Sequence, residues 1–215
     1  MRNPRISGLY AITPDLSDTD DLLNKTQQAL EGGARLVQYR NKSADKMLLK
    51  EQAKSLLQLC RAYEIPLIIN DHIDLAMAID ADGVHVGLGD IPVSAARERL
   101  GQGKIVGASC YNNLHLALQA EESGSDYVAF GAFFPSATKT DTVPVSTNLV
   151  DYAKQKVTVP IVGIGGIRLI NAAAVIESGC DAIAVCNDLF GTENITVKAL
   201  QYTQLFAEKS KHNVI

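Results

Sequence analysis

The sequence has little of what marks a secreted, membrane-bound or nucleic-acid-binding protein. Its four cysteines contain no CxxC pair, and two of them, Cys110 and Cys186, fall in apolar runs where a thiol behaves as a small hydrophobic side chain. No apolar run approaches the roughly 20 residues of a membrane span. Residues 1–5 lead into a strand-like run without the apolar core of a secretory signal. We therefore expect a protein of the reducing cytoplasm.

Positive charge is also scarce. Lys and Arg number 20 against 24 Asp and Glu, which gives a formal net charge of −4. No basic arm or lysine-rich run is present, so we expect neither a nucleic acid nor a membrane as partner. Any anionic ligand must then be held by a local cluster of positive side chains. The hydrophobic content of 47% is typical of a globular protein with a large buried core.

What the sequence does contain is a series of short apolar runs rich in Val and Ile. They are residues 6–13, 34–40, 66–71, 83–87, 104–110, 127–133, 160–166 and 182–188. Such runs, separated by segments with apolar spacing near 3.6, are typical of buried parallel strands joined by helices. Eight units predict an α/β fold, a closed (β/α)8 TIM barrel. Because this barrel usually needs ~250 residues, we expect residues 1–215 to form a single domain.

Helical segments fill the gaps between the runs. We expect helices at residues 20–32, 44–63, 73–79, 94–100, 114–123, 149–156, 169–178 and 195–209. The longest stretch without periodicity, residues 135–147, interrupts the sixth unit. A loop of that length is often functional.

The end of the second strand carries three hydrogen-bond donors. Alternation along the strand directs Gln38 and Arg40 to the same side, and Lys42 follows just beyond. The rigid fork of Arg and the mobile charge of Lys together suit a diphosphate. The alternative is a solvated strand end with surface salt bridges.

Two carboxylates follow the third and fourth strands. Asn70 and Asp71 end the third strand, and Asp90 lies shortly after the fourth. Oxygen ligands of this kind favour Mg²⁺, which binds through one or two carboxylates and substrate phosphate. Either aspartate would also serve as a helix cap. His72 and His85 add a further alternative, the His and Asp ligands of a metal-dependent epimerase, although an isolated strand histidine is more often structural.

Glycines end the seventh strand. Phosphate often lies in the loops after strands seven and eight of such barrels, where backbone amides and a helix N-terminus face the anion. Gly166 would let the backbone approach a phosphate, and the amides of Cys186 and Asn187 would complete the site. The alternative is that glycine here only relieves crowding.

Hydroxyl groups and one further lysine lie between these regions. Ser109 ends the fifth strand, and the long loop contains Ser136, Ala137, Thr138 and Lys139. This loop segment taken alone would also suit a flexible polar connection. Two phosphate-suited regions and a carboxylate pair on one rim predict a diphosphate substrate with a metal and a second, phosphorylated substrate. Group transfer with diphosphate as leaving group follows.

The sequence resembles the thiamine-phosphate synthase family. The resemblance rests on blocks that occur in order along almost the whole chain: LYAIT at 9–13, VQYRNK at 37–42, IIND at 68–71, GVHVG at 83–87 with Asp90, FPSATK at 134–139 and VGIGGI at 162–167. It implies an enzyme that joins hydroxymethylpyrimidine diphosphate to hydroxyethylthiazole phosphate with Mg²⁺, releasing diphosphate. It also implies a dissociative mechanism, in which the diphosphate departs before the thiazole nitrogen attacks.

The resemblance also assigns residues. It implies that the pyrimidine diphosphate is bound by Gln38, Arg40, Lys42, Asn70, Ser109 and Lys139, of which Arg40, Lys42, Ser109 and Lys139 are catalytic. It places the metal on Asp71 and Asp90. It places the thiazole phosphate on Ser136, Ala137, Thr138, Gly166, Cys186 and Asn187. A homo-oligomer is a further expectation.

Some positions depart from the family pattern. Leu88, Ala132, Ser136, Asn187 and the Cys110 segment differ from the residues common there. None of them removes a charged member of the expected site, so they bear on affinity more than on reaction type. The alternatives are a thiazole tautomerase-like branch, whose members tend to lose the diphosphate-binding set, and a non-catalytic protein that binds thiazole phosphate.

Overall fold

Eight parallel strands close into a barrel in the computed structural model, which describes residues 6–135 and 145–212, without the side chains of residues 147 and 210–212. The strands are β1 (Gly8–Ile12), β2 (Leu36–Tyr39), β3 (Leu67–Asn70), β4 (Gly83–Val86), β5 (Ile105–Tyr111), β6 (Tyr127–Phe130), β7 (Ile161–Ile164) and β8 (Ala182–Val185). Each strand pairs with its neighbour in sequence, and β1 pairs with β8 through the register Gly8 to Ala182 and Ala11 to Val185. The predicted (β/α)8 barrel is confirmed.

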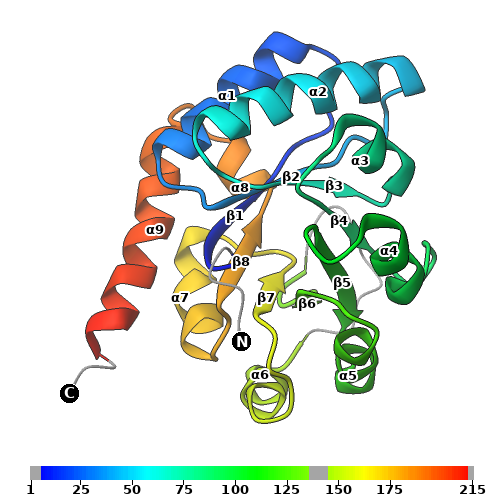
Figure 1. Cartoon of the computed structure of the whole chain (residues 1–215). Helices are drawn as coiled ribbons and strands as arrows, with labels where there is room; N and C mark the ends of the chain where they lie inside the picture. Colours follow the sequence, from blue (N-terminus) through cyan, green and yellow to red (C-terminus); the bar gives the residue numbers. More distant parts are fainter. Residues whose placement is uncertain (1–5, 136–144, 213–215) are drawn as a thin grey trace.

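Helices follow the strands and form an outer ring (Figure 1). They are α1 (Thr19–Glu31), α2 (Lys46–Ala62), α3 (Ile73–Ile79), α4 (Val93–Leu100), α5 (Leu114–Glu122), α6 (Thr147–Lys154), α7 (Leu169–Glu177), α8 (Asn187–Phe190) and α9 (Ile195–His212). All eight expected helices are present with small shifts at their ends. None of the helices within the described ranges combines the length and apolar character needed to cross a bilayer.

The expected extent of the eighth strand was wrong at its end. The strand stops at Val185, and the short helix α8 begins at Asn187. The carbonyl of Cys186 accepts hydrogen bonds from the amides of Leu189 (3.1 Å) and Phe190 (2.9 Å). Both of these side chains are buried. Burial of two apolar side chains in one helical turn therefore outweighs the extended conformation that the apolar run predicted. The sixth strand is also shorter than predicted and ends at Phe130.

Inward-facing side chains fill the barrel itself. They include Tyr10, Leu36, Ile68, Ile105, Tyr127 and Val162, all almost fully buried. Gly107 faces this interior, and a Cβ there would overlap the ring of Tyr127. The missing side chain of a strand glycine thus makes room for one of the two tyrosines of the interior.

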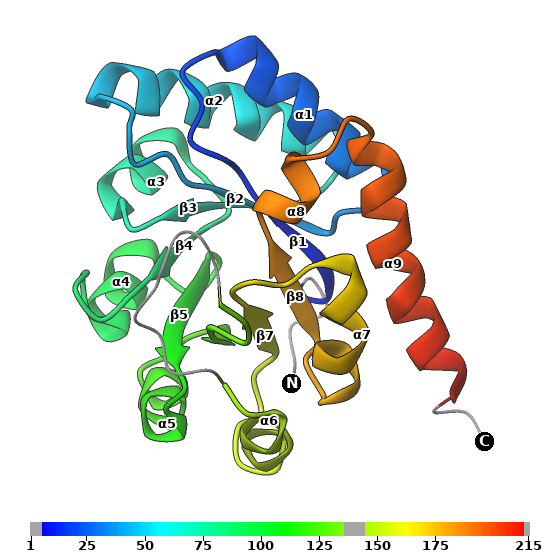
Figure 2. The ribbon, with the colours of Figure 1, turned by 180° about the vertical axis from the view of Figure 1, so that it is seen from behind.

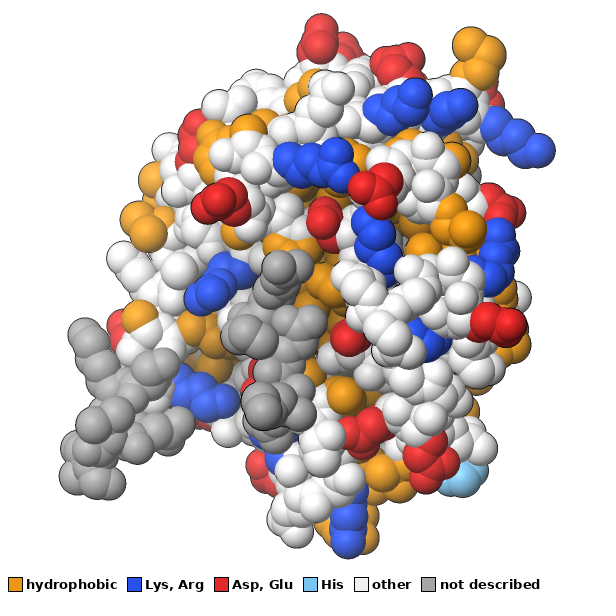
Figure 3. All heavy atoms as spheres, in the orientation of Figure 1, with side chains coloured by type: hydrophobic (Ala, Val, Ile, Leu, Met, Phe, Trp, Pro, Cys, Tyr) orange, Lys and Arg blue, Asp and Glu red, His pale blue; other side chains and the backbone are white. Residues whose placement is uncertain are grey.

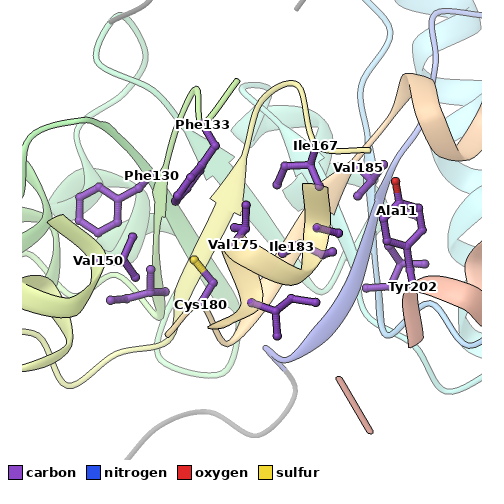
Figure 4. Packing of buried hydrophobic residues seen from close by; sticks show 14 of the residues in the cluster. Ala11, Phe130, Phe133, Val150, Ile167, Val175, Cys180, Ile183, Val185 and Tyr202 are labelled. Atoms are coloured by element: carbon purple, nitrogen blue, oxygen red, sulfur yellow. The ribbon is translucent and has the colours of Figure 1, made fainter. Parts of the chain in front are cut away.

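A second core lies between the barrel and the helices. Figure 4 shows it on one side of the barrel, where Phe130 of β6 and Ile183 of β8 lie in one cluster with Val150 of α6 and Val175 of α7. The last helix, α9, lies alongside α1 and α7, as the two opposite views in Figures 1 and 2 show. The end of the chain thereby packs against its first helix.

Three aspartates at the start of strands β4, β6 and β8 hold the neighbouring strands. Each lies directly before its strand and accepts a hydrogen bond from the backbone of the preceding strand: Asp82 from Leu67 (2.9 Å), Asp126 from Val106 (2.8 Å) and Asp181 from Ile161 (2.8 Å). At the amino ends of the strands, these aspartates thus accept hydrogen bonds from N–H groups that strand pairing leaves without an acceptor. One end of the barrel is tied together, and the other is left for ligands.

Arg97 of α4 extends this network and generates a stability prediction. Its guanidinium is almost buried and contacts Asp126 and three carbonyls, those of Gly101 (2.7 Å), Lys104 (2.7 Å) and Gly124 (3.0 Å). Arg97→Ala should lower the free energy of unfolding by about 3 kcal/mol, because it removes the cation paired with a partly buried carboxylate and the donors to three carbonyls. Denaturant unfolding followed by circular dichroism measures this loss.

The matched control is Arg61→Ala. Arg61 pairs with Asp80 at the surface, where the two side chains are 55% and 72% exposed. Solvated pairs of this kind contribute less than about 1 kcal/mol. Equal losses in the two variants would contradict the role given to Arg97.

Candidate active site

The expected site residues that the structure describes gather at the carboxyl ends of the strands. Gln38, Asn70 and Ser109 lie within the last three positions of β2, β3 and β5, and the others lie one to four residues beyond the end of a strand: Arg40, Lys42, Asp71, Asp90, Gly166, Cys186 and Asn187. Closure of the barrel brings these ends to one rim. Ser136, Ala137, Thr138 and Lys139 lie outside the described residues.

An aspartate that the sequence analysis did not single out orients the positive cluster. The carboxylate of Asp15 lies 3.2 Å from the Arg40 guanidinium and accepts a hydrogen bond from the Lys42 amide at 3.1 Å. The Thr13 hydroxyl donates to the Arg40 carbonyl (3.1 Å) and accepts from its amide (3.0 Å). The segment after β1 therefore holds the segment after β2. The Thr-Pro-Asp step at residues 13–15 is the sequence signal that could have found this contact.

The alternative of a strand-end salt bridge is thus partly correct for Arg40. Its ion pair with Asp15 is partly exposed, with the side chains 30% and 38% accessible. Arg40 and Lys42 nevertheless also line a cavity of about 320 Å³ together with Asn70, Asp71 and His72. On the face shown in Figure 3, basic and acidic side chains are interspersed. Anion binding there depends on local clusters, as the composition indicates.

Two carboxylates meet beside this cavity. Burial raises the pKa of Asp71, and the carboxylate of Asp90 next to it raises that pKa further, while Lys42 lowers it. Asp71 lies in the left-handed region (φ 59°), and its amide donates to the His85 carbonyl at 2.9 Å. The Asp90 carboxylate accepts from the Gly87 amide at 2.7 Å. Two like charges held together in this way favour a bound cation.

The helix-cap alternative for these aspartates was wrong. The residues that cap α3 and α4 are His72 and Pro92. Asp71 lies one position before His72, and Asp90 serves the turn after β4. Residues 6–135 and 145–212 contain no group of three or more His, Cys, Asp or Glu side chains placed to bind a metal. The pair of carboxylates would therefore need ligand or water oxygens to complete a coordination shell.

A chain of hydrogen bonds crosses the barrel interior beneath the rim. It runs from Gln38 Nε2 to Tyr10 Oη (2.9 Å), to Tyr127 Oη (2.9 Å), to His85 Nδ1 (2.9 Å), and from His85 Nε2 to Ser109 Oγ (2.8 Å). Burial lowers the pKa of His85 to about 4, so the imidazole is neutral at pH 7. Both ring nitrogens have partners. His85 is therefore a structural histidine, and the epimerase alternative loses one of its two candidate ligands.

The β7 and β8 ends form the third part of the rim. Gly165 and Gly166 have positive φ values of 96° and 63°. The Asn171 side chain donates to the Gly166 carbonyl (3.2 Å) and accepts from the Arg168 amide (2.8 Å). Asn171 thereby fixes the turn that leads into α7. No acceptor within the described residues bonds the Gly166 amide.

Asp188 joins this turn to the end of β8. Its carboxylate accepts from the Leu169 amide (3.3 Å) and from the Tyr202 hydroxyl (2.7 Å), and Lys198 lies 3.2 Å away. Burial would raise the pKa of Asp188, but these donors hold it below its usual value. Nearby, burial raises the pKa of Cys186 to about 11, so its thiol remains protonated. Asp188 and Asn171 are supporting residues that the sequence analysis missed.

Known proteins are similar to this chain over most of its length. A family model described as thiamine monophosphate synthase matches residues 9–189. A thiamine-phosphate synthase of Nitrosospira multiformis is 55% identical over 207 residues, which cover 96% of this chain and 88% of that protein. One from Methylobacillus flagellatus is 52% identical over 203 residues, which cover 94% of this chain and 97% of that protein.

Solved structures give the same result. A thiamine phosphate pyrophosphorylase from Pyrococcus furiosus matches with a TM-score of 0.84 and 35% identity, covering 96% of this chain and 98% of that one. A 3-hexulose-6-phosphate synthase, at 15% identity and a TM-score of 0.67, shares the fold alone. The match of sequence over nearly the whole length, together with the barrel and its polar rim, shows that this chain belongs to the thiamine-phosphate synthase family of transferases.

Proposed function

We propose that this chain joins hydroxymethylpyrimidine diphosphate to hydroxyethylthiazole phosphate, which gives thiamine phosphate and diphosphate. The observation that carries the proposal is the position of Arg40 and Lys42 beside Asp71 at one cavity of the rim. Cations next to a carboxylate pair suit a substrate whose diphosphate brings both negative charge and metal ligands. A thiazole phosphate alone would leave this part of the rim without a ligand.

The positive cluster would bind the diphosphate. Asp15 holds the Arg40 guanidinium in place at 3.2 Å, so less side-chain freedom is lost when an anion binds. Lys42 is exposed and adds a mobile charge. Asn70, at the end of β3 and in the same cavity, adds an amide. Gln38 and Ser109 would face the pyrimidine ring from the barrel interior.

Asp71 and Asp90 would hold Mg²⁺. Burial and the neighbouring Asp90 carboxylate both raise the pKa of Asp71, so its charged form is unfavourable, and a divalent cation between the two carboxylates would offset that cost. Mg²⁺ would supply electrostatic stabilisation of the departing diphosphate. The residues present fit the ion, because the pair leaves positions open for phosphate and water oxygens.

The β7 and β8 ends would bind the second phosphate. The amide of Gly166 has no acceptor among the described residues and would bind an anion, and the N-terminus of α7 follows the same turn. Cys186 and Asn187 would contribute backbone amides from the first turn of α8. The roles of Ser136, Ala137, Thr138 and Lys139, which lie outside the described residues, stay predictions.

The proposed reaction is dissociative. The bond between the pyrimidine methylene carbon and the diphosphate oxygen breaks first, and the electron pair leaves with the diphosphate. The thiazole nitrogen then donates its lone pair to that carbon, so no general base is required. Arg40, Lys42 and Lys139 would stabilise the charge that develops on the leaving group.

Residues 1–215 would form one catalytic domain that works in the cytoplasm. Assembly into a homo-oligomer stays a prediction, which sedimentation velocity of the purified protein would check.

The experiment that tests the function uses the purified protein with both proposed substrates. Thiamine phosphate and diphosphate should form in equal amounts when Mg²⁺ is present, and chelation of the metal should abolish both. Tight binding of thiazole phosphate without product would instead indicate the tautomerase-like or non-catalytic branch.

Asp71→Asn tests the metal site. The variant should lower kcat/KM by about a hundredfold and raise the Mg²⁺ concentration needed for half-maximal rate, because one carboxylate of the pair is lost. Asp74→Asn is the matched control. Asp74 lies in the first turn of α3, close to Asp71 in sequence, but its side chain is 86% exposed and pairs with Arg99. An unchanged metal dependence in Asp71→Asn would remove Asp71 from the site.

Gly166→Ala tests the phosphate turn. A Cβ at Gly166 would lie 2.5 Å from the Phe134 carbonyl oxygen, and φ is 63°. We expect a loss of about 1–3 kcal/mol in the free energy of unfolding and weaker thiazole phosphate binding in calorimetry. Gly103→Ala, where a Cβ meets nothing within 4 Å, should change neither. Wild-type phosphate affinity in Gly166→Ala would show that this turn does not contact the phosphate.

A further inference from the structure

We propose that Tyr10, Tyr127 and His85 form a buried positioning relay, which fixes Gln38 as a hydrogen-bond acceptor and Ser109 as a donor toward the pyrimidine substrate. Only the identity of the ligand rests on the proposed function. The relay itself is a feature of the described side chains. We name its five members, Gln38, Tyr10, Tyr127, His85 and Ser109, the interior relay.

The three inner members of the relay are sealed from solvent. Tyr10 is 1% exposed, Tyr127 is 0% and His85 is 7%. The rings of Tyr10 and Tyr127 meet edge to face with centroids 6.0 Å apart, and His85 stacks on Tyr127 at 5.6 Å. Each side chain is therefore held by packing as well as by its hydrogen bonds.

We infer the direction of the hydrogen bonds from the arrangement in which every buried proton of the chain has an acceptor. A tyrosine hydroxyl has one proton, and a neutral imidazole has one donor and one acceptor nitrogen. With Gln38 Nε2 donating to Tyr10, this arrangement has Tyr10 donate to Tyr127 and Tyr127 donate to His85 Nδ1. The remaining proton is on His85 Nε2, which donates to the hydroxyl oxygen of Ser109.

One end of the interior relay is thereby a hydrogen-bond acceptor and the other a hydrogen-bond donor. No described residue donates to Gln38 Oε1, so this oxygen is left to accept from a ligand. The Ser109 proton is not used within the relay and is left to donate. A flat heterocycle that carries a donor near an acceptor fits this pair of ends, and an aminopyrimidine is such a ring.

A purely apolar interior would fill the same space. Burial of hydroxyl and imidazole groups costs free energy that their hydrogen bonds at best offset. The relay begins and ends at two residues of the rim, Gln38 and Ser109, and it crosses from β2 to β5. We infer that it positions these two ends, and that Tyr127 acts on the substrate through them.

Tyr127→Phe tests the relay, because it removes one hydroxyl and keeps the ring. The variant should raise KM for the pyrimidine diphosphate by about tenfold, while KM for the thiazole phosphate changes less than about twofold. The control is Ser178→Ala, which removes another buried hydroxyl, bonded to the Val175 carbonyl at the far end of α7. Equal changes in both KM values would overturn the positioning role.

A combined variant separates positioning from general loss of packing. Tyr127 bonds neither Gln38 nor Ser109 directly, yet in a Gln38→Ala, Ser109→Ala background that removes both ends of the relay, Tyr127→Phe should raise KM for the pyrimidine diphosphate by less than about twofold. Another tenfold increase would show that Tyr127 acts independently of the two ends, and the relay would be rejected.

A ligand-free measurement decides the relay even if the synthase assay fails. Imidazole ¹⁵N shifts, with the His85 signals assigned by their loss in His85→Asn, should show one neutral tautomer protonated at Nε2. Tyr127→Phe should convert it to an averaged mixture. A wild-type imidazole that is averaged, or protonated at Nδ1, would overturn the proposed polarity. An inactive wild type with the expected tautomer would reject the proposed function and retain the relay.

Discussion

The pairing of β1 with β8 is the contact on which the rest of the structure depends. It joins the two ends of the sheet, so that all eight strands run parallel around one axis. Their carboxyl ends then lie on one rim and their amino ends on the other. The aspartates Asp82, Asp126 and Asp181 use the amino-end rim for stability, which leaves the carboxyl-end rim free for chemistry.

The narrow interior created by this closure also shapes the site. Because Gly107 has no side chain, the Tyr127 ring fits beside it. The Tyr127 hydroxyl then lies within hydrogen-bonding distance of both Tyr10 and His85. Polar groups thus replace part of the apolar filling just below the rim. Packing and the proposed ligand recognition would then share the same residues, with a buried histidine beneath the polar rim.

Polar side chains from neighbouring segments hold the residues of the rim in place. Asp15 fixes Arg40 and the Lys42 backbone, Asn171 fixes the Gly166 turn, and Asp188 ties the start of α7 to α9 through Tyr202. These contacts come from segments far apart in sequence. Functional groups of opposite charge can lie close together here because each is held by its own partner.

Much of this molecule could be predicted from local sequence, because the signals are local. The apolar runs and the helical spacing fix eight strand-helix units, and polar residues such as Arg40, Asp71 and Ser109 stand at strand ends that a parallel barrel must bring together. Only the tertiary structure decided that Tyr10 meets Tyr127, 117 positions away, that Asp15 pairs with Arg40, and that Asn187 belongs to a helix rather than a strand. The physical reason is that these contacts depend on barrel register and on packing around β8, and neither leaves a periodic pattern in the sequence.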